Sequence, residues 1–116
     1  MTILDLSTDV SDGVAHVRLS GELDISSADK VEQELERVDP EASKAVVLDL
    51  RELSFMDSTG LRLILETERR TREHGRRFAL VRGPHAVQRV FDVTRLDERL
   101  DFVDDPGDVV AGAAGE

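Results

Sequence analysis

Hydrophobic and polar residues alternate at the start of the chain with the pattern of two strands. A short apolar segment, Ile3–Leu6, predicts the first strand, and Asp12-Gly13 predicts a tight turn after it. Residues 14–19 alternate apolar and polar side chains with the period of a half-buried strand, and His16 falls on the more polar face. We therefore expect a β-hairpin, in which His16 has no ligand role.

Three later stretches repeat apolar residues at the spacing of a helix. The first follows Ser26 and Ser27, a candidate serine cap, and ends at Asp39-Pro40. Its expected apolar stripe is Val31, Leu35 and Val38.

The second helical stretch opens at 57–60 and ends at His74-Gly75 with a left-handed glycine. Its expected stripe is Leu61, Ile64, Leu65 and Glu68. The third opens at Gly83-Pro84 with proline in its first turn. Its expected stripe is Val87, Val90 and Phe91.

Further strands are predicted between these helices. The run 45–50 is almost continuously aliphatic, which is typical of a central strand buried on both faces. Residues 77–81 and 100–103 predict two more strands. The order β-β-α-β-α-β-α-β predicts one α/β domain over residues 1–105, a mixed sheet of about four to five strands packed with three to four helices. Residues 106–116 are expected to form a weak helix or a frayed tail.

Composition excludes several functional classes. The chain of 116 residues has no cysteine, which excludes disulfides, thiolate metal sites and cysteine nucleophiles, and its three histidines are scattered. Neither phosphate-loop fingerprint occurs, and no serine, histidine and aspartate match a catalytic signature. We expect no catalytic, cofactor-binding or metal-binding residue, and no enzyme.

Charge and hydropathy also limit the partners. The net charge of −10 disfavours binding to nucleic acid or to an anionic membrane. The charge is uneven, because residues 62–99 are net positive, which fits either a polar docking surface or solvated helix faces. No apolar run approaches the roughly 20 residues of a membrane span, so a cytoplasmic location is expected.

One segment combines a buried strand with a polar helix start. After the run 45–50, Asp57-Ser58-Thr59-Gly60 opens the second helix. Loops that follow the carboxyl ends of parallel strands are where α/β sheets place their sites. Ser58, or Thr59 if the helix begins one residue later, would lie at the positive end of the helix dipole, where a phosphoryl group is favoured. The alternative is that Ser58 is only the N-cap of this helix.

This segment resembles the phosphorylation motif of the STAS domains, in particular the bacterial anti-sigma-factor antagonists. The resemblance includes 20–24 (SGELD), 47–50 (VLDL), 55–61 (FMDSTGL) and 87–96. It implies that a partner anti-sigma-factor serine kinase phosphorylates Ser58. It also implies that the unphosphorylated form binds this kinase and frees a sigma factor, whereas the phosphorylated form does not bind.

The resemblance also suggests a docking surface. Its expected residues are Glu22, Asp24, Asp57, Ser58, Thr59, Gly60 and Arg62. We expect Asp57 to have a structural and docking role and Thr59 to serve as a helix cap or in packing. Glu22 and Asp24 could equally serve only to form a turn. The sequence departs from the family at Arg62, where many relatives have a small residue, and at Arg95, a place often filled by glycine. We expect a monomer.

Two alternative functions remain open. The chain could be a STAS regulatory subunit of a lipid- or anion-transport assembly, with Ser58 unmodified. It could also be a receiver with Asp57 as phosphoacceptor. The receiver has less support, because no paired acidic motif follows the first strand and no lysine lies near Arg82.

Overall fold

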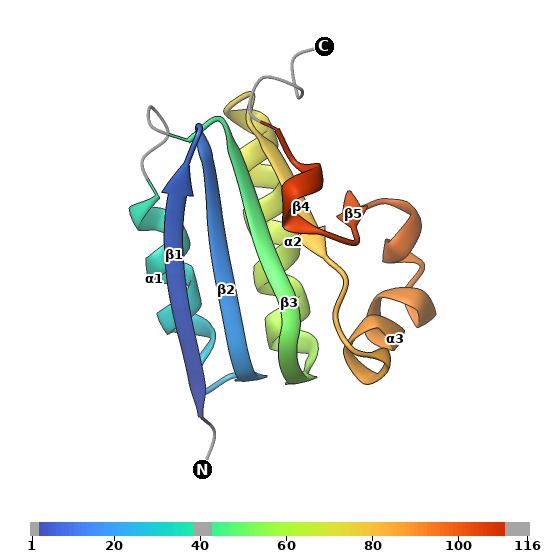
Figure 1. Cartoon of the computed structure of the whole chain (residues 1–116). Coiled ribbons are helices and arrows are strands. Elements are labelled where there is room, and N and C mark those ends of the chain that lie inside the picture. The colour runs from blue at the N-terminus through green and yellow to red at the C-terminus, as the bar shows by residue number, and fades with distance from the viewer. Residues whose placement is uncertain (1–2, 39–42, 111–116) are drawn as a thin grey trace.

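Five strands form one sheet in the order β1-β2-β3-β4-β5 (Figure 1). The computed structural model describes residues 3–38 and 43–110. Along the chain the elements are β1 (Leu4–Ser11), β2 (Val14–Leu23), α1 (Ala28–Arg37), β3 (Ala45–Met56), α2 (Ser58–Glu73), β4 (Arg77–Val81), α3 (His85–Val93) and β5 (Phe102–Val103). Two short 3₁₀ helices, Leu96–Glu98 and Pro106–Asp108, lie before and after β5. The predicted α/β class and element order are confirmed.

The strand directions explain why all three helices lie on one side. β1 and β2 form the predicted antiparallel hairpin, and β2, β3, β4 and β5 are parallel. Each parallel connection steps one strand in the same direction along the sheet. Because such connections are nearly always right-handed, their helices must cover the same face. Figure 1 shows α1 and α2 behind the sheet and α3 toward the β5 edge.

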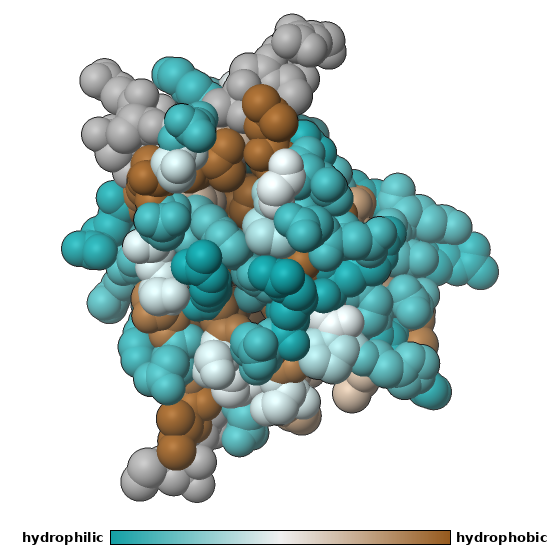
Figure 2. Space-filling model, viewed as in Figure 1, coloured by the Kyte–Doolittle hydropathy of each residue, from teal (hydrophilic) through white to brown (hydrophobic). Residues whose placement is uncertain are grey.

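The two faces of the sheet differ in how they are covered. The helical face holds the main core, which includes Leu48, Ile64 and Phe91. On the opposite face a smaller cluster forms around Val47 and Val81 and is covered by Val109. Figure 2 shows the rest of this face as mostly hydrophilic, with apolar residues gathered toward its upper end. Residues 45–50 are all buried, which confirms the prediction of a central strand.

Three strands extend further than their apolar runs predict. β1 continues to Ser11, and β2 continues through 20–23, beyond the predicted strand of residues 14–19. β3 continues through polar residues to Met56, so the short loop expected before α2 is absent and Asp57 alone separates strand from helix. Pairing with a neighbouring strand supports these polar segments, with two register shifts between β2 and β3. β5, by contrast, is limited to its last two predicted residues.

The helices also differ in detail from their predictions. Ser27 occupies the N-cap position of α1, but its side chain makes no capping hydrogen bond. In α2 the buried stripe is rotated from the predicted one and consists of Gly60, Leu63, Ile64, Thr67 and Thr71. Threonine can be buried there because Thr67 Oγ1 donates to the Leu63 carbonyl at 2.8 Å.

The start of α3 and the end of α1 were also predicted from prolines. Pro84 is the N-cap of α3 and precedes its first turn. The predicted stop at Asp39-Pro40 lies outside the described residues.

Two residues after helices have a positive φ, at positions where the sequence leads us to expect it. Gly75 follows α2 with a φ of 70°, as predicted for a left-handed glycine stop. Arg95 has a φ of 62°, a conformation that costs a residue with a side chain about 1–2 kcal/mol. This conformation explains why glycine suits the position that Arg95 occupies.

The outer edge of the sheet at β1 is partly closed by α1. Lys30 Nζ donates to the Leu4 carbonyl at 2.8 Å, and Thr8 Oγ1 donates to Glu34. Helix α1 thus contributes side chains to the edge strand as well as to the core.

Candidate functional site

The carboxyl ends of β2 and β3 bring most of the predicted site residues to one edge of the sheet. Leu23 and Met56 are register partners at these ends, and the Asp57 N–H donates to the Leu23 carbonyl at 3.2 Å. Glu22 and Asp24 flank Leu23, and 58–60 follow Asp57 directly. Two segments with residues 28–54 between them in the sequence therefore form one surface, which we call the strand-end surface (Glu22–Ser27 and Phe55–Arg62).

Asp57, and not Ser58, caps α2. Its Oδ1 accepts from the Thr59 N–H at 2.9 Å and from the Gly60 N–H at 3.1 Å. Ser58 is the first residue of the helix. The alternative that Ser58 is the N-cap is therefore wrong, because aspartate in extended conformation directly after β3 reaches the free N–H groups first.

The Ser58 side chain is exposed and available. Its hydroxyl makes no hydrogen bond within the described part of the chain, and the residue is exposed. Thr59 is half-buried. Of the two candidate residues at this helix start, Ser58 is the more accessible to an approaching enzyme.

Gly60 allows α2 to lie directly against β2. A Cβ at this position would come within 2.8 Å of Leu23 Cγ and 3.0 Å of the Leu23 carbonyl oxygen. A side chain would force the helix away from the sheet. Gly60 therefore has a packing role that fixes the height of Ser58 above the strand ends.

The β2–α1 loop is held by its own serines. Ser27 Oγ donates to the Glu22 carbonyl at 2.8 Å and accepts from the Asp24 N–H at 3.0 Å. The Asp24 carboxylate accepts from the Ser26 hydroxyl at 2.7 Å. This arrangement supports the turn-forming role for Asp24 and orders the acidic loop beside α2.

Two exposed apolar side chains on the strand-end surface were missed by the sequence reasoning. Ile25 is 79% exposed and lies between Asp24 and Ser26, and Phe55 is 47% exposed near the end of β3. The sequence signal was an isoleucine inside a polar loop. Surfaces that bind another protein commonly combine exposed apolar side chains at the centre with a polar rim.

Arg62 lies one turn after Ser58 on α2. It lines a shallow cleft between α1 and α2 of about 160 Å³, together with Asp29, Glu32 and Glu66. Despite these acids, it forms no ion pair within 4.0 Å in the described ranges. It is exposed and continues the strand-end surface along α2.

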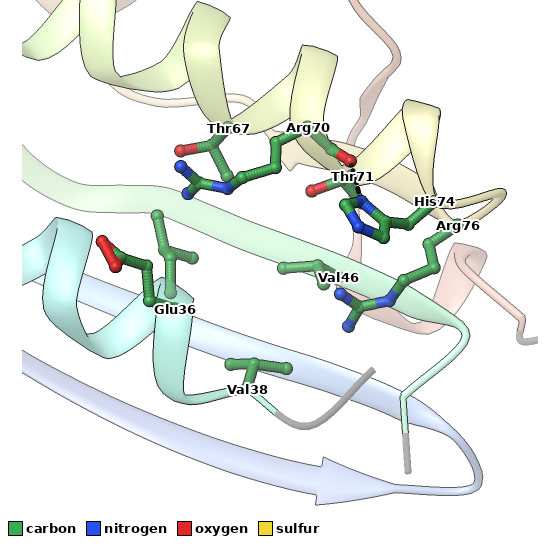
Figure 3. A pocket seen from close by; sticks show the side chains of 9 residues that line it. Glu36, Val38, Val46, Thr67, Arg70, Thr71, His74 and Arg76 are labelled. Atoms are coloured by element: carbon green, nitrogen blue, oxygen red, sulfur yellow. Dashed lines mark hydrogen bonds between the residues drawn. The ribbon is translucent and has the colours of Figure 1, made fainter. Parts of the chain in front are cut away.

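A second pocket, with a mixed apolar and polar lining, lies at the other end of α2 (Figure 3). Its volume is about 180 Å³, and it contains none of the predicted site residues. Arg70 and Glu36 lie on opposite walls, from α2 and α1, and His74 Nδ1 donates to the Arg70 carbonyl at 2.7 Å. This pocket is separate from the strand-end surface.

A buried carboxylate lies on the open face of the sheet. Asp49 Oδ2 accepts from His16 Nε2 at 2.8 Å and from Arg51 Nη2 at 2.8 Å, and its side chain is 5% exposed. Burial raises the pKa of Asp49, but hydrogen bonds from Arg51 and His16 outweigh it and lower the pKa to about 2. His16 thus has a structural partner on the face that the sequence indicated.

We predict that Asp49 stabilises the fold above pH 4 and loses this effect in acid. A carboxyl whose pKa is lower in the folded state contributes fully above its unfolded pKa and progressively less as pH falls toward the folded value. The difference in unfolding free energy between the parent and Asp49→Asn should be roughly 1.5 kcal/mol smaller at pH 2.5 than at pH 5.5. Urea titrations at both pH values measure it; a difference independent of pH would contradict the prediction.

The described residues contain no group of three or more histidine, aspartate or glutamate side chains placed to hold a metal ion. No helix within the described ranges is long and apolar enough to cross a membrane. What the strand-end surface offers is an exposed hydroxyl, three acidic residues and two apolar side chains, a set suited to contact with another protein.

Comparisons with known proteins agree on one family. The STAS domain model matches residues 5–109. The anti-sigma-B factor antagonist of Staphylococcus epidermidis is 28% identical over 97 residues, which cover 84% of this chain and 90% of that protein.

Solved structures share the fold. An anti-sigma factor antagonist from Mycobacterium paratuberculosis superposes with a TM-score of 0.82 at 27% identity, covering 91% of this chain and 90% of that one. The Bacillus cell fate determinant SpoIIAA in its phosphorylated form has a TM-score of 0.69 at 22% identity, covering 90% and 95% respectively. This second likeness is one of fold alone.

Proposed function

Because the chain belongs to the STAS domain family, we propose that it is an anti-sigma factor antagonist that is switched by phosphorylation of Ser58. In its unphosphorylated form it binds an anti-sigma factor serine kinase and thereby frees a sigma factor. Phosphate on Ser58 ends this binding. In this role the chain is a substrate and a binding partner, and not itself an enzyme.

The observation that carries the proposal is the exposure of Ser58 at the start of α2. Asp57 accepts hydrogen bonds from the N–H groups of Thr59 and Gly60, so the Ser58 hydroxyl is not needed as a cap and has no other hydrogen bond among the described residues. Relatives named as anti-sigma factor antagonists support the choice of partner. The proposed docking residues are those of the strand-end surface that the sequence suggested, together with Ile25 and Phe55.

The chemistry required of the partner is phosphoryl transfer from ATP. Ser58 Oγ attacks the γ-phosphorus, a new O–P bond forms, the bond to the ADP oxygen breaks, and the serine proton leaves to a base on the kinase. Such a transfer needs the ATP phosphates to face Ser58 at close range. A phosphate already on Ser58 would meet these phosphates and be repelled, which accounts for the loss of binding.

The transport and receiver alternatives remain outcomes of the same test. Capture of transport-assembly subunits, in place of an ATP-binding kinase, would favour the first. An acid-labile phosphate on Asp57 would favour the second. No observation on the described residues favours either one specifically.

We predict that an ATP-dependent serine kinase captured on the immobilised chain from native cell extract adds one phosphoryl group, at Ser58. Its exposed hydroxyl is the reachable nucleophile at the helix start. Phosphopeptide mapping of the parent and of Ser58→Ala measures the site. Modification confined to Ser26, Ser27 or Thr59 would refute the assignment.

A further inference from the structure

Arg62 is an exposed cation one helical turn from the proposed phosphorylation site. Residues four apart on a helix lie on the same face, with Cβ atoms about 5–6 Å apart. Arg62 is exposed and forms no ion pair with a described residue. Ser58 is exposed at the position four residues before it. In the unphosphorylated chain the two side chains form no hydrogen bond with each other.

The same helix shows what this spacing does when the first residue is an anion. Glu68 Oε2 lies 3.2 Å from Arg72 Nε, with the acid four residues before the arginine, as Ser58 is before Arg62. An acid placed N-terminal to a base at this spacing is the more favourable order. Phosphoserine carries nearly two negative charges and three acceptor oxygens, which match the fork of donors on a guanidinium.

We propose that Arg62 binds the phosphate carried by Ser58, so that the phosphorylated state has an ion pair that the unphosphorylated state lacks. This inference rests on the proposed function for its relevance in the cell. Arg62 then acts as a positioning residue: it draws the phosphate along α2 and favours its doubly charged form. A small residue at this position could not do so.

Carboxylates near Ser58 and Arg62 also affect the second pKa of the phosphate. Asp57 precedes Ser58, Asp24 lies on the neighbouring loop, and Asp29, Glu32 and Glu66 line the cleft beside Arg62. These carboxylates disfavour the second ionisation of the phosphate in the parent and in any variant at residue 62 alike. A comparison of the two therefore isolates the contribution of Arg62.

The test measures the second pKa of phosphoserine installed at position 58 during protein synthesis, by ³¹P NMR from pH 4 to 8. The ordinary value is about 6. In Arg62→Gln we expect this pKa to rise by roughly 0.3–0.5 of a pH unit, a two- to threefold change in proton affinity. Arg62→Lys should give a smaller rise, since it keeps the charge but loses the fork.

Arg72→Gln is the matched control, because it removes an arginine of similar exposure from the same helix, far from Ser58. It should leave the phosphate pKa unchanged. Equal values in the parent and in Arg62→Gln would overturn the proposal, as would an equal rise in Arg72→Gln. Because the phosphoserine is installed without any kinase, this result stands apart from whether a cellular kinase modifies Ser58.

Discussion

Ser58→Asp is expected to weaken binding of the proposed anti-sigma factor kinase by about 10- to 100-fold while the fold is kept. One negative charge placed against the partner's ATP phosphates costs roughly 1.5–3 kcal/mol in a desolvated interface. Ser58→Ala should bind like the parent and escape inactivation by ATP. Binding isotherms of parent, Ser58→Ala and Ser58→Asp with the captured kinase measure the effect.

Because of the capping geometry, substitutions at Ser58 should change partner binding without changing the stability of the fold. Because Asp57 supplies the cap of α2, neither substitution at Ser58 should change the unfolding free energy by more than about 0.5 kcal/mol. Had Ser58 been the cap, Ser58→Ala would have cost about 1 kcal/mol. Thermal melts check this point. If Ser58→Asp binds as tightly as Ser58→Ala, the switch does not lie at this residue.

Gly21→Ala is expected to cost about 3 kcal/mol of unfolding free energy, the largest loss of stability among the glycine sites. Gly21 has a φ of 114°, where residues with side chains are strained. A Cβ here would lie 2.2 Å from the Ile3 carbonyl oxygen, so the start of β1 would also have to move. Urea denaturation of the variant measures the cost.

Gly75→Ala is the matched control for this substitution. Gly75 also has a positive φ, of 70°, but no atom lies within 4 Å of the added Cβ. It should cost only about 1 kcal/mol, from backbone conformation alone. The difference between the two variants measures the close approach of β1 to β2. Equal costs would show that this approach relaxes without penalty.

Much of the fold could be predicted from the sequence because its patterns were local. Strand 77–81 and the aliphatic run 45–50 were placed by their own composition, and the element order and family resemblance are confirmed. Strand ends were less accurate. Residues 20–23 and 51–56 are polar or mixed, and they extend their strands because a neighbour pairs with them, a long-range effect that no local pattern reveals.

The site was predicted in position but not in detail. Asp57 and Ser58 are both good capping residues, and only the direct passage from β3 into α2 decides between them. The hydrogen bonds of Asp49 come from Arg51, two residues further along the same strand, and from His16, which the pairing of β2 with β3 brings close. The exposure of Phe55 follows from a register shift near the end of β3, which alternation of apolar residues could not foresee.

The contact of Lys30 with the Leu4 carbonyl has a consequence for self-association. An uncovered edge strand offers a row of backbone groups on which another chain can add a strand, and this is a common route to aggregation. Here an ammonium group occupies an acceptor of β1, and Asp5 and Asp9 add charge along the same strand. Strand addition at this edge would have to displace Lys30 and bring a second chain close to these carboxylates. Encounters between copies of the protein are thereby directed away from β-sheet growth.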